Sequence, residues 1–482
     1  MTSALRRNLI PLIVATALFM ENLDATVLAT SLPAIAKDLG ANPIHLKLAL
    51  TTYLLALAVF IPASGWMADR YGAKNVFRTA MAVFAAGSIA CALSTGLWSL
   101  VAARILQGIG GAMMVPVGRL IVLRTIPKSE VIGAIAWLTI PALVGPVLGP
   151  PLGGFITTYF DWRWIFWINI PVAILGMALI TRFIPDVRED VTGGFDLTGF
   201  LLVGPGLSMF LTGVTLMGLD LVSHQTVVAI TLGGAALLIS YVFYALRATA
   251  PLIDLRLLKL PTFRSAVLGG FLFRAGLGAA PFLLPLLFQY GFGMTPFQSG
   301  MMTFATGVGA MFMKTQAATI LRRWGYKRVL IVNAIVSALF AAIPAFYTAA
   351  TPPLLITALF LIGGLSRSLQ FTSINTLAYA DVPPERLSRA TSFAAVGQEL
   401  AGSVGVTVAA LGLELMQRLQ GGGAIDPGHF PPVFLLIAFL SACSALVFAR
   451  LPNDAGSALL AKPASRDTEP AKQAAEASEG HF

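Results

Sequence analysis

Charged residues, cysteine and histidine are all scarce in this chain. Asp, Glu, Lys and Arg make up 11% of the 482 residues, which is about half the share found in soluble proteins. The two cysteines, Cys91 and Cys443, fall inside apolar runs, and the four histidines are scattered over loops and the C-terminal tail. The sequence therefore predicts neither a disulfide framework nor a metal site.

Motifs for nucleotide binding and for covalent catalysis are also missing. The glycine-rich stretch 108–111 follows no predicted strand, and no Lys-Ser or Lys-Thr pair follows it, so it is not a phosphate-binding loop. No nucleophile–base pair is apparent, which argues against the alternative of a membrane enzyme that acts on lipid. We expect no enzymatic activity and no cofactor, and any transport must then be driven by an ion gradient such as that of protons.

Long apolar runs dominate what is present. Hydrophobic residues make up 57% of the chain, its mean hydropathy is +0.81, and the runs do not alternate as the strands of a membrane β-barrel do. A helix needs about 20 apolar residues to cross a bilayer core about 30 Å thick. The sequence predicts an all-α membrane bundle of fourteen spans, near residues 8–30, 46–68, 77–96, 98–121, 132–157, 164–183, 197–219, 225–246, 263–289, 296–320, 328–347, 353–379, 390–415 and 430–450.

The net charge of +10 reflects topology and does not indicate nucleic-acid binding. With the N-terminus in the cytoplasm, the cytoplasmic loops hold 19 Lys and Arg residues and the opposite loops hold four. This bias orients the chain by the positive-inside rule, and an even number of spans places both termini in the cytoplasm. The first run exceeds a signal-peptide core and lacks a convincing cleavage site, so it is expected to stay as the first span. We expect a multi-pass protein of a bacterial inner membrane.

Two weak internal repeats indicate duplication. The loop 65–74 matches the loop 318–327 in its Arg-x-Gly-x-Lys pattern at a shift of 253 residues, and a second match appears at a shift of 256. Six spans need only about 180 residues, so the shift leaves room for two extra helices. Parallel halves of this kind place the substrate between them. The predicted parts are a six-helix bundle at 1–189, an inserted helix pair at 190–250, a second six-helix bundle at 251–452, and a disordered cytoplasmic tail at 453–482.

Two acidic residues lie in the first span. Asp24 belongs to the segment Leu-Asp-Ala-Thr-Val, and Glu21 precedes it by three residues, so both lie on much the same helix face. An ionisable residue within a span costs about 2.5–3.5 kcal/mol on insertion scales and normally faces the bundle interior or a water-filled path. Both are candidates for proton coupling. A structural carboxylate, hydrogen-bonded to neighbouring helices, is the alternative for Asp24.

The loop after the second span contains a candidate conformational motif. Gly65 and Gly72 permit close backbone approach and a tight turn, and Asp69 can pair with a nearby Arg or cap a helix N-terminus. Arg70 and Lys74 are expected at the level of the lipid headgroups. This loop is predicted to act as a charge latch that biases the access states, with simple topology-setting charge as the alternative.

The fifth span contains a regular pattern of glycine and proline. Gly145, Gly149 and Gly153 recur every four residues on one face, which lets helices touch backbone to backbone. Pro146 and Pro150 would kink the helix and free backbone groups for a bend. We predict a role in conformational change, with a purely structural kink as the alternative.

Together these motifs resemble the major facilitator superfamily and, within it, the fourteen-span drug:proton antiporter family. The resemblance covers the chain to about residue 450. It implies two halves that alternate access, and the glycine–proline motif implies an exporter. It also implies that Arg104 in the fourth span takes part in proton relay or charge balance, because a buried Arg keeps its charge at any cellular pH. Gln107, one turn further on, is predicted to line the substrate cavity.

Further charged residues lie within the second half. Glu399 matches no motif and is a candidate for proton or substrate binding on residue type alone. The predicted substrate cavity also includes Arg274, Phe282, Arg367 and Gln398, although an aromatic residue such as Phe282 is more common in a packed core.

The sequence thus predicts a proton-coupled antiporter that exports small amphipathic, drug-like compounds. The alternative is an exporter of a polar or anionic metabolite or a metal chelate: Arg274, Arg367 and Lys314 would suit an anion, and the three acids above would suit a cation. The expected partners are the small-molecule substrate, protons and the lipid bilayer, with no nucleic acid. A periplasmic adaptor and an outer-membrane channel are further candidates, and a monomer is expected.

Overall fold

The computed structural model describes residues 3–126, 131–185, 194–217, 221–383, 386–421 and 423–460. Long helices make up most of this part of the chain, because a bilayer interior offers backbone N–H and C=O groups no partner and a helix pairs them internally.

The helices of the first half follow the predicted spans closely. The sixth span is divided at Ile168 into a short helix and a longer one. The helices are α1 (Ser3–Asp38), α2 (Lys47–Tyr71), α3 (Ala73–Ala92), α4 (Leu97–Thr125), α5 (Val131–Tyr159), α6 (Trp164–Trp167) and α7 (Asn169–Phe183).

The rest of the chain contains the inserted pair and the second half. The pair is α8 (Leu197–Leu216) and α9 (His224–Arg247). The second half consists of η1 (Leu255–Lys259), α10 (Pro261–Gly278), α11 (Ala280–Leu286), η2 (Leu287–Gly291), α12 (Pro296–Trp324), α13 (Tyr326–Ala342), η3 (Ile343–Phe346), α14 (Pro353–Leu377), α15 (Leu387–Leu419), η5 (Pro427–His429), α16 (Phe430–Ala449) and α17 (Ser457–Leu460).

Twelve helical segments of the described residues are long and apolar enough to cross a membrane. The 29-residue helix α12 is not among them, and the side chains of the first part of α5 lie outside the described residues. Polar residues such as Gln298, Lys314 and Gln316 dilute the hydropathy of α12. The all-α membrane bundle is therefore confirmed, and the count of fourteen spans stays a prediction.

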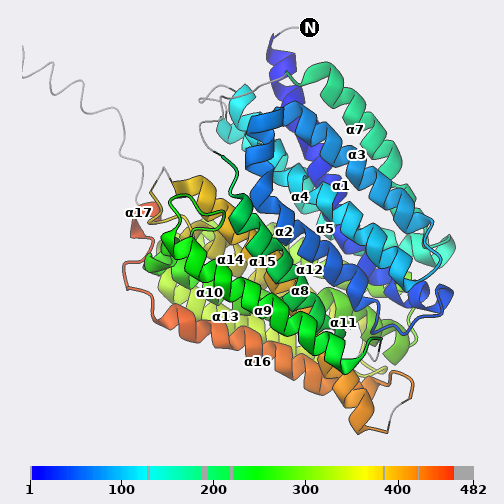
Figure 1. Cartoon of the computed structure of the whole chain (residues 1–482). Helices are drawn as coiled ribbons and strands as arrows, with labels where there is room; N and C mark the ends of the chain where they lie inside the picture. The colour runs from blue at the N-terminus through cyan, green and yellow to red at the C-terminus, as the bar shows by residue number, and fades with distance from the viewer. Residues whose placement is uncertain are drawn as a thin grey trace, which may run out of the picture.

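The helices of each half pack mainly on one another (Figure 1). In the first half α1 packs on α5 and α3 on α4, and in the second half α12 packs on α14 and α10 on α16. The halves meet where α5 packs on α12 and α2 on α15. The inserted helix α8 packs on α9, and also contacts α2 and α15. The pair α8–α9 thus covers one of the two seams between the halves.

The predicted tail begins too early in the chain. Lys327 Nζ donates a hydrogen bond to Asn453 Oδ1 at 2.9 Å, Ala455 is buried, and Gly456 lies against the ring of Tyr326. Residues 453–460 therefore pack on the start of α13, and the boundary at 453 is wrong because these contacts bind the segment to the second half. The rest of the predicted tail, 461–482, lies outside the described residues.

Exposed loops at opposite ends of the bundle provide a test of the predicted orientation. Thr249, between α9 and η1, is predicted to face the cytoplasm, and Ala350, between η3 and α14, the opposite side; both are exposed. In a chain with Cys91 and Cys443 replaced by alanine, a membrane-impermeant thiol reagent added to intact cells should label Ala350→Cys and should leave Thr249→Cys unlabelled until the cells are opened. The reverse pattern would overturn the orientation.

Candidate functional site

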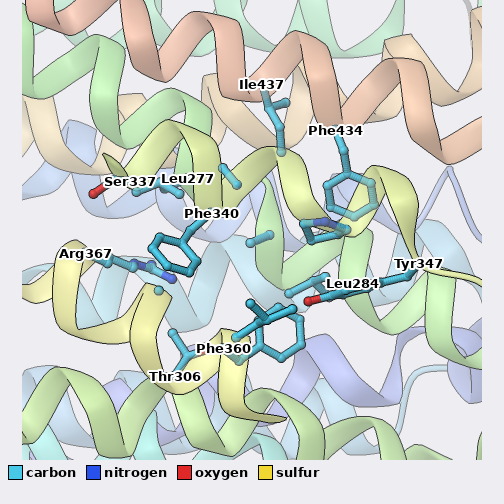
Figure 2. Close-up of a pocket in the computed structure, with 15 residues that line it drawn as sticks. Leu277, Leu284, Thr306, Ser337, Phe340, Tyr347, Phe360, Arg367, Phe434 and Ile437 are labelled. Carbon is cyan, nitrogen blue, oxygen red and sulfur yellow. The ribbon is translucent and has the colours of Figure 1, made fainter. Parts of the chain in front are cut away.

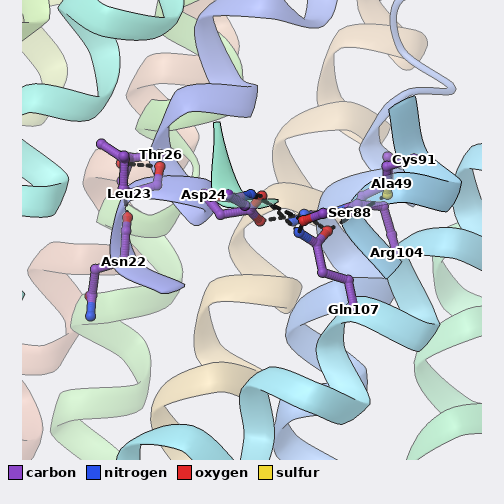
Figure 3. Close-up of polar contacts among 10 residues, drawn as sticks. Asn22, Leu23, Asp24, Thr26, Ala49, Ser88, Cys91, Arg104 and Gln107 are labelled. Atoms are coloured by element: carbon purple, nitrogen blue, oxygen red, sulfur yellow. Dashed lines mark hydrogen bonds and ion pairs between the residues drawn. The ribbon is translucent and has the colours of Figure 1, made fainter. Parts of the chain in front are cut away.

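A buried network of polar side chains joins four helices of the first half (Figure 3). The carboxylate of Asp24 on α1 accepts hydrogen bonds from Arg104 Nη1 at 2.6 Å, Gln107 Nε2 at 2.8 Å and Asn169 Nδ2 at 2.9 Å. Gln107 and Asn169 also donate to Ser88 Oγ on α3, at 2.7 and 3.1 Å. The network therefore connects α1, α3, α4 and α7 through one carboxylate.

Arg104 extends this network to α2. Its side chain is completely buried, and its Nε donates to the carbonyl oxygen of Ala49 at 3.2 Å. The guanidinium lies 4.0 Å from the centroid of the Tyr53 ring, where the ring face attracts a cation. Arg104 and Asp24 form an ion pair with side chains 0% and 1% exposed. Each charge is thus neutralised by the other inside the bundle.

The structure changes the reading of two residues in this network. Gln107, predicted to line the substrate cavity, instead bonds Asp24 and Ser88 and is completely buried. Asn169 was not among the predicted site residues, although an amide side chain near the start of an apolar span was a signal for it. The structure brings Asp24 and Arg104 together as a pair. Both readings of Asp24, a structural carboxylate and a part of a proton relay, are consistent with this pairing.

The other two predicted proton-coupling residues lie nearby. Glu21 is one turn before Asp24, it is 9% exposed, and its Oε2 atom has no hydrogen-bond partner. Glu399 on α15 lies within electrostatic range of Glu21 and of Arg274 on α10. Glu21 on α1 and Glu399 on α15 therefore lie near the seam between the halves, one in each half.

The loop after α2 forms part of the predicted latch. Asp69 Oδ1 pairs with Arg124 Nη2 at 2.6 Å, and so joins the end of α2 to the end of α4. Lys74 Nζ donates to the carbonyl oxygen of Thr181 at 2.9 Å, and Arg70 is exposed. Gly72 has a φ of +85°, a conformation that favours glycine.

The expectation for Gly65 is wrong. A β-carbon added there would meet nothing within 4 Å, and the residue is exposed. Within the part of the chain that the structure describes, the close approach predicted for Gly65 is therefore absent, because no helix packs on that face of α2.

The glycine stripe of α5 packs within its own half. A β-carbon added to Gly145 would lie 3.1 Å from Leu23 N, one at Gly149 would lie 2.7 Å from Thr26 Cβ, and one at Gly153 would contact Val27 and Thr30. All of these neighbours belong to α1. The predicted backbone-to-backbone contact is present, and it joins α5 to α1 and not to the other half.

A different set of glycines forms the contact between the halves. A β-carbon at Gly154 would lie 2.8 Å from Phe297 Cα on α12, one at Gly300 would lie 2.7 Å from Pro150 C, and one at Gly307 would lie 3.0 Å from Val147 Cα. The helices α5 and α12 therefore touch along their backbones over this segment.

Hydrogen bonds join the halves at the same end of the bundle. Gln289 Nε2 donates to the carbonyl oxygen of Thr30 at 2.8 Å, and the backbone N–H of Phe297 donates to Thr158 Oγ1 at 3.0 Å. We call this the closed end, defined by the end of α1, η2, the end of α5 and the start of α12.

A cavity of about 450 Å³ lies between the halves, with walls from α1, α5, α11, α12, α14 and α15. Arg367 and Gln398 line it, as predicted, and so does Lys314. Arg274 reaches the wall indirectly, because its Nη2 donates to Asn375 Oδ1 at 2.5 Å. Phe282 is completely buried in the hydrophobic core and does not line this cavity. Pro146 and Pro150 of α5 face the cavity.

Comparisons with known proteins agree with this arrangement. The family model described as "Major Facilitator Superfamily" matches residues 14–406 and 266–478. The chain belongs to the Major Facilitator Superfamily. It is 40% identical to the protein named "Putative multidrug resistance protein MdtD" of Salmonella paratyphi A over 451 residues, which cover 92% of this chain and 94% of that protein. The same figures hold for the protein of that name from Salmonella typhimurium.

Solved structures of other transporters share the fold at low sequence identity. A D-xylose-proton symporter matches with a TM-score of 0.67 and 15% identity, over 93% of this chain and 98% of that one. The human organic anion transporter MFSD10 matches with a TM-score of 0.61 and 15% identity, over 92% and 99%. This chain is therefore a multi-pass membrane transporter and not an enzyme, as predicted.

The Asp24–Arg104 pair predicts strong energetic coupling in this Major Facilitator protein. Asp24→Asn leaves the Arg104 charge buried without a counter-charge, a change that costs about 3–5 kcal/mol in other proteins. In a denaturant titration of purified protein in mild detergent, Asp24→Asn and Arg104→Gln should each be destabilised, and the double variant by much less than the sum. Additive losses would show that the pair is not coupled.

The two faces of α5 predict different effects of added bulk. Gly149→Leu should lower the thermal stability, because the α1–α5 contact is needed in every state and overpacking costs about 1–3 kcal/mol or more. Gly300→Leu should stay folded but separate the halves at the closed end, so that Thr158→Cys reacts faster with a thiol reagent. Met301→Leu, an exposed neighbour on α12, is the control. Unchanged labelling in Gly300→Leu would contradict this.

Proposed function

We propose that this chain is a proton-coupled antiporter that exports small amphipathic molecules across a bacterial inner membrane by alternating access. The observation that carries the proposal is the cavity between the two halves, which is closed at one end. The name of the Salmonella relatives, which refers to multidrug resistance, supports an export function for this chain.

Alternating access requires a cavity whose two ends close in turn. In this state the hydrogen bonds of Gln289 and Phe297 and the α5–α12 backbone contact block the closed end. With the predicted orientation, the closed end faces away from the cytoplasm, so the cavity would receive substrate from the cytoplasmic side. A transporter that loads from the cytoplasm and then opens outward exports its substrate.

Proton coupling requires a carboxyl group whose protonation changes during the cycle. Asp24 supports such a role through its connection to five helices, because protonation would remove the charge that holds Arg104. Glu21 and Glu399 support a second route, because they lie across the seam that must separate when the halves rock. The fourteen-span topology, a monomeric state and a periplasmic adaptor with an outer-membrane channel belong to the same proposal.

Transport by reconstituted protein tests the proposal. Proteoliposomes with an imposed pH gradient should drive uphill movement of an amphipathic substrate, and dissipating the gradient should stop it. Asp24→Asn should lose uphill movement yet retain exchange of labelled for unlabelled substrate, because exchange requires alternating access but no net proton movement. The same amount of folded protein is reconstituted in each case, since the variant is less stable.

Lys37 is exposed near the end of α1 and provides a control. Lys37→Gln should leave both uphill transport and substrate exchange unchanged. If uphill transport survives in Asp24→Asn but is lost in Glu399→Gln, Glu399 and not Asp24 is the residue that carries the proton. Substrate transport by the unmodified protein that does not depend on the pH gradient would refute proton coupling.

A further inference from the structure

The charged side chains that line the cavity are positive. Lys314 on α12 and Arg367 on α14 line the cavity, and no acidic residue is found among the described residues that line it. The acids considered above lie elsewhere: Asp24 is paired with Arg104, and Glu21 and Glu399 are not part of the wall. A molecule in this cavity therefore meets two cations and no anion.

The two cations of the wall have no ion-pair partner among the described residues. Neither Lys314 nor Arg367 forms an ion pair with any side chain of the part of the chain that the structure describes. Arg274 differs, since it bonds Asn375 and lies within range of Glu399. The Phe371 ring lies near both arginines, with its centroid 5.5 Å from Arg367 Cζ and 5.3 Å from Arg274 Cζ.

An unpaired cation within a membrane bundle, such as the half-buried Arg367, is costly and is normally found where it acts on a substrate or an ion. The Phe371 ring offsets only a small part of this cost, and the two cations that line the same cavity also repel each other. A negatively charged guest would neutralise both, and a positively charged guest would add to the repulsion. The cavity is therefore suited to a negatively charged group.

An apolar side pocket continues the cavity into the second half (Figure 2). This pocket has a volume of about 70 Å³, and it shares Ala280, Leu284, Thr306 and Arg367 with the cavity. Its wall includes the rings of Phe340, Phe360, Phe434 and Tyr347. In Figure 2 the Arg367 side chain reaches the edge of the pocket beside Phe340. A cation thus stands at the entrance of an aromatic pocket.

We propose that the substrate is an amphipathic organic anion. Its acidic group binds Arg367 and Lys314 in the cavity of about 450 Å³, which also holds its apolar or aromatic part. The edge of that part reaches the side pocket among Phe340, Phe360 and Phe434, whose volume of about 70 Å³ is smaller than the roughly 150 Å³ that takes in a whole benzene ring. This assignment rests on the proposed function only in taking the cavity as the transport site. It narrows that function from amphipathic molecules in general to those with a carboxylate, sulfonate or similar group.

Binding of matched probes to the purified protein in detergent tests the assignment. The probes are 2-naphthalenesulfonate, which carries a negative group, and 2-naphthylmethylammonium, which has the same ring system with a positive group. Isothermal titration should show at least tenfold tighter binding of the sulfonate. Tighter binding of the ammonium compound, or no binding of either at millimolar concentration, would overturn the proposal.

Variants locate the binding site. Arg367→Gln and Lys314→Gln should each weaken sulfonate binding about tenfold, and Phe360→Ala should weaken it while leaving the preference for the anion. Lys314 is exposed, so Lys314→Gln should fold even if Arg367→Gln does not. Arg328→Gln, a surface arginine stacked on Trp324, is the matched control and should bind normally. Unchanged affinity in Lys314→Gln, or equal loss in the control, would place the anion elsewhere.

The binding measurement needs neither a proton gradient nor turnover. It therefore distinguishes failure of the anion site from failure of proton-coupled export. Sulfonate binding that depends on Arg367 and Lys314, without transport driven by a pH gradient, would refute proton coupling and retain the anion site. Gradient-driven export of the ammonium compound without sulfonate binding would refute the anion site and retain the proposed function.

Discussion

A bilayer interior cannot solvate a charge, so Asp24 and Arg104 are stable in this bundle only as a pair. The Asp24 carboxylate is also the acceptor for Gln107 and Asn169, and Arg104 reaches α2 through the carbonyl oxygen of Ala49. One ion pair therefore fixes the relative positions of α1, α2, α3, α4 and α7. Removal of either charge leaves the other exposed to a low dielectric, which is why these helices depend on it together. The first half can then move as a unit, as rocking of one half against the other requires.

Two kinds of helix contact follow from this rigidity. Inside the first half, Gly145, Gly149 and Gly153 bring α5 onto α1 with no room for a side chain. Between the halves, Gly154 and Gly300 permit an equally close contact of α5 with α12. The first contact joins elements that the ion pair already holds together, and the second joins elements that no buried ion pair connects. Close packing with a hydrogen bond from Phe297 to Thr158 but without a buried ion pair suits a contact that must form and separate.

The halves also differ in how they handle charge. In the first half, Asp24 pairs with Arg104 inside the bundle, and Asp69 pairs with Arg124 where α2 and α4 end. The second half leaves Arg367 and Lys314 facing the cavity without a carboxylate. The first half therefore serves as a rigid scaffold, and the second half supplies the positively charged side chains that can bind a substrate.

The apolar runs and the distribution of Lys and Arg determined the all-α class and the positions of the helices, because hydropathy acts locally along the chain. The short motifs around Asp24, Asp69, Arg104 and Gly149 indicated the superfamily. The apolar runs also identified Asp24, Arg104 and Glu399 as notable, since a charge within an apolar run is conspicuous. Only the tertiary structure decided which partner each one meets. Gln107 turned from the cavity to Asp24, Phe282 was buried in the core, and the glycine stripe faced α1, because helix rotation and interhelical packing are set by residues far apart in the sequence. Lys314 and Arg367, 53 positions apart, line the same cavity for the same reason.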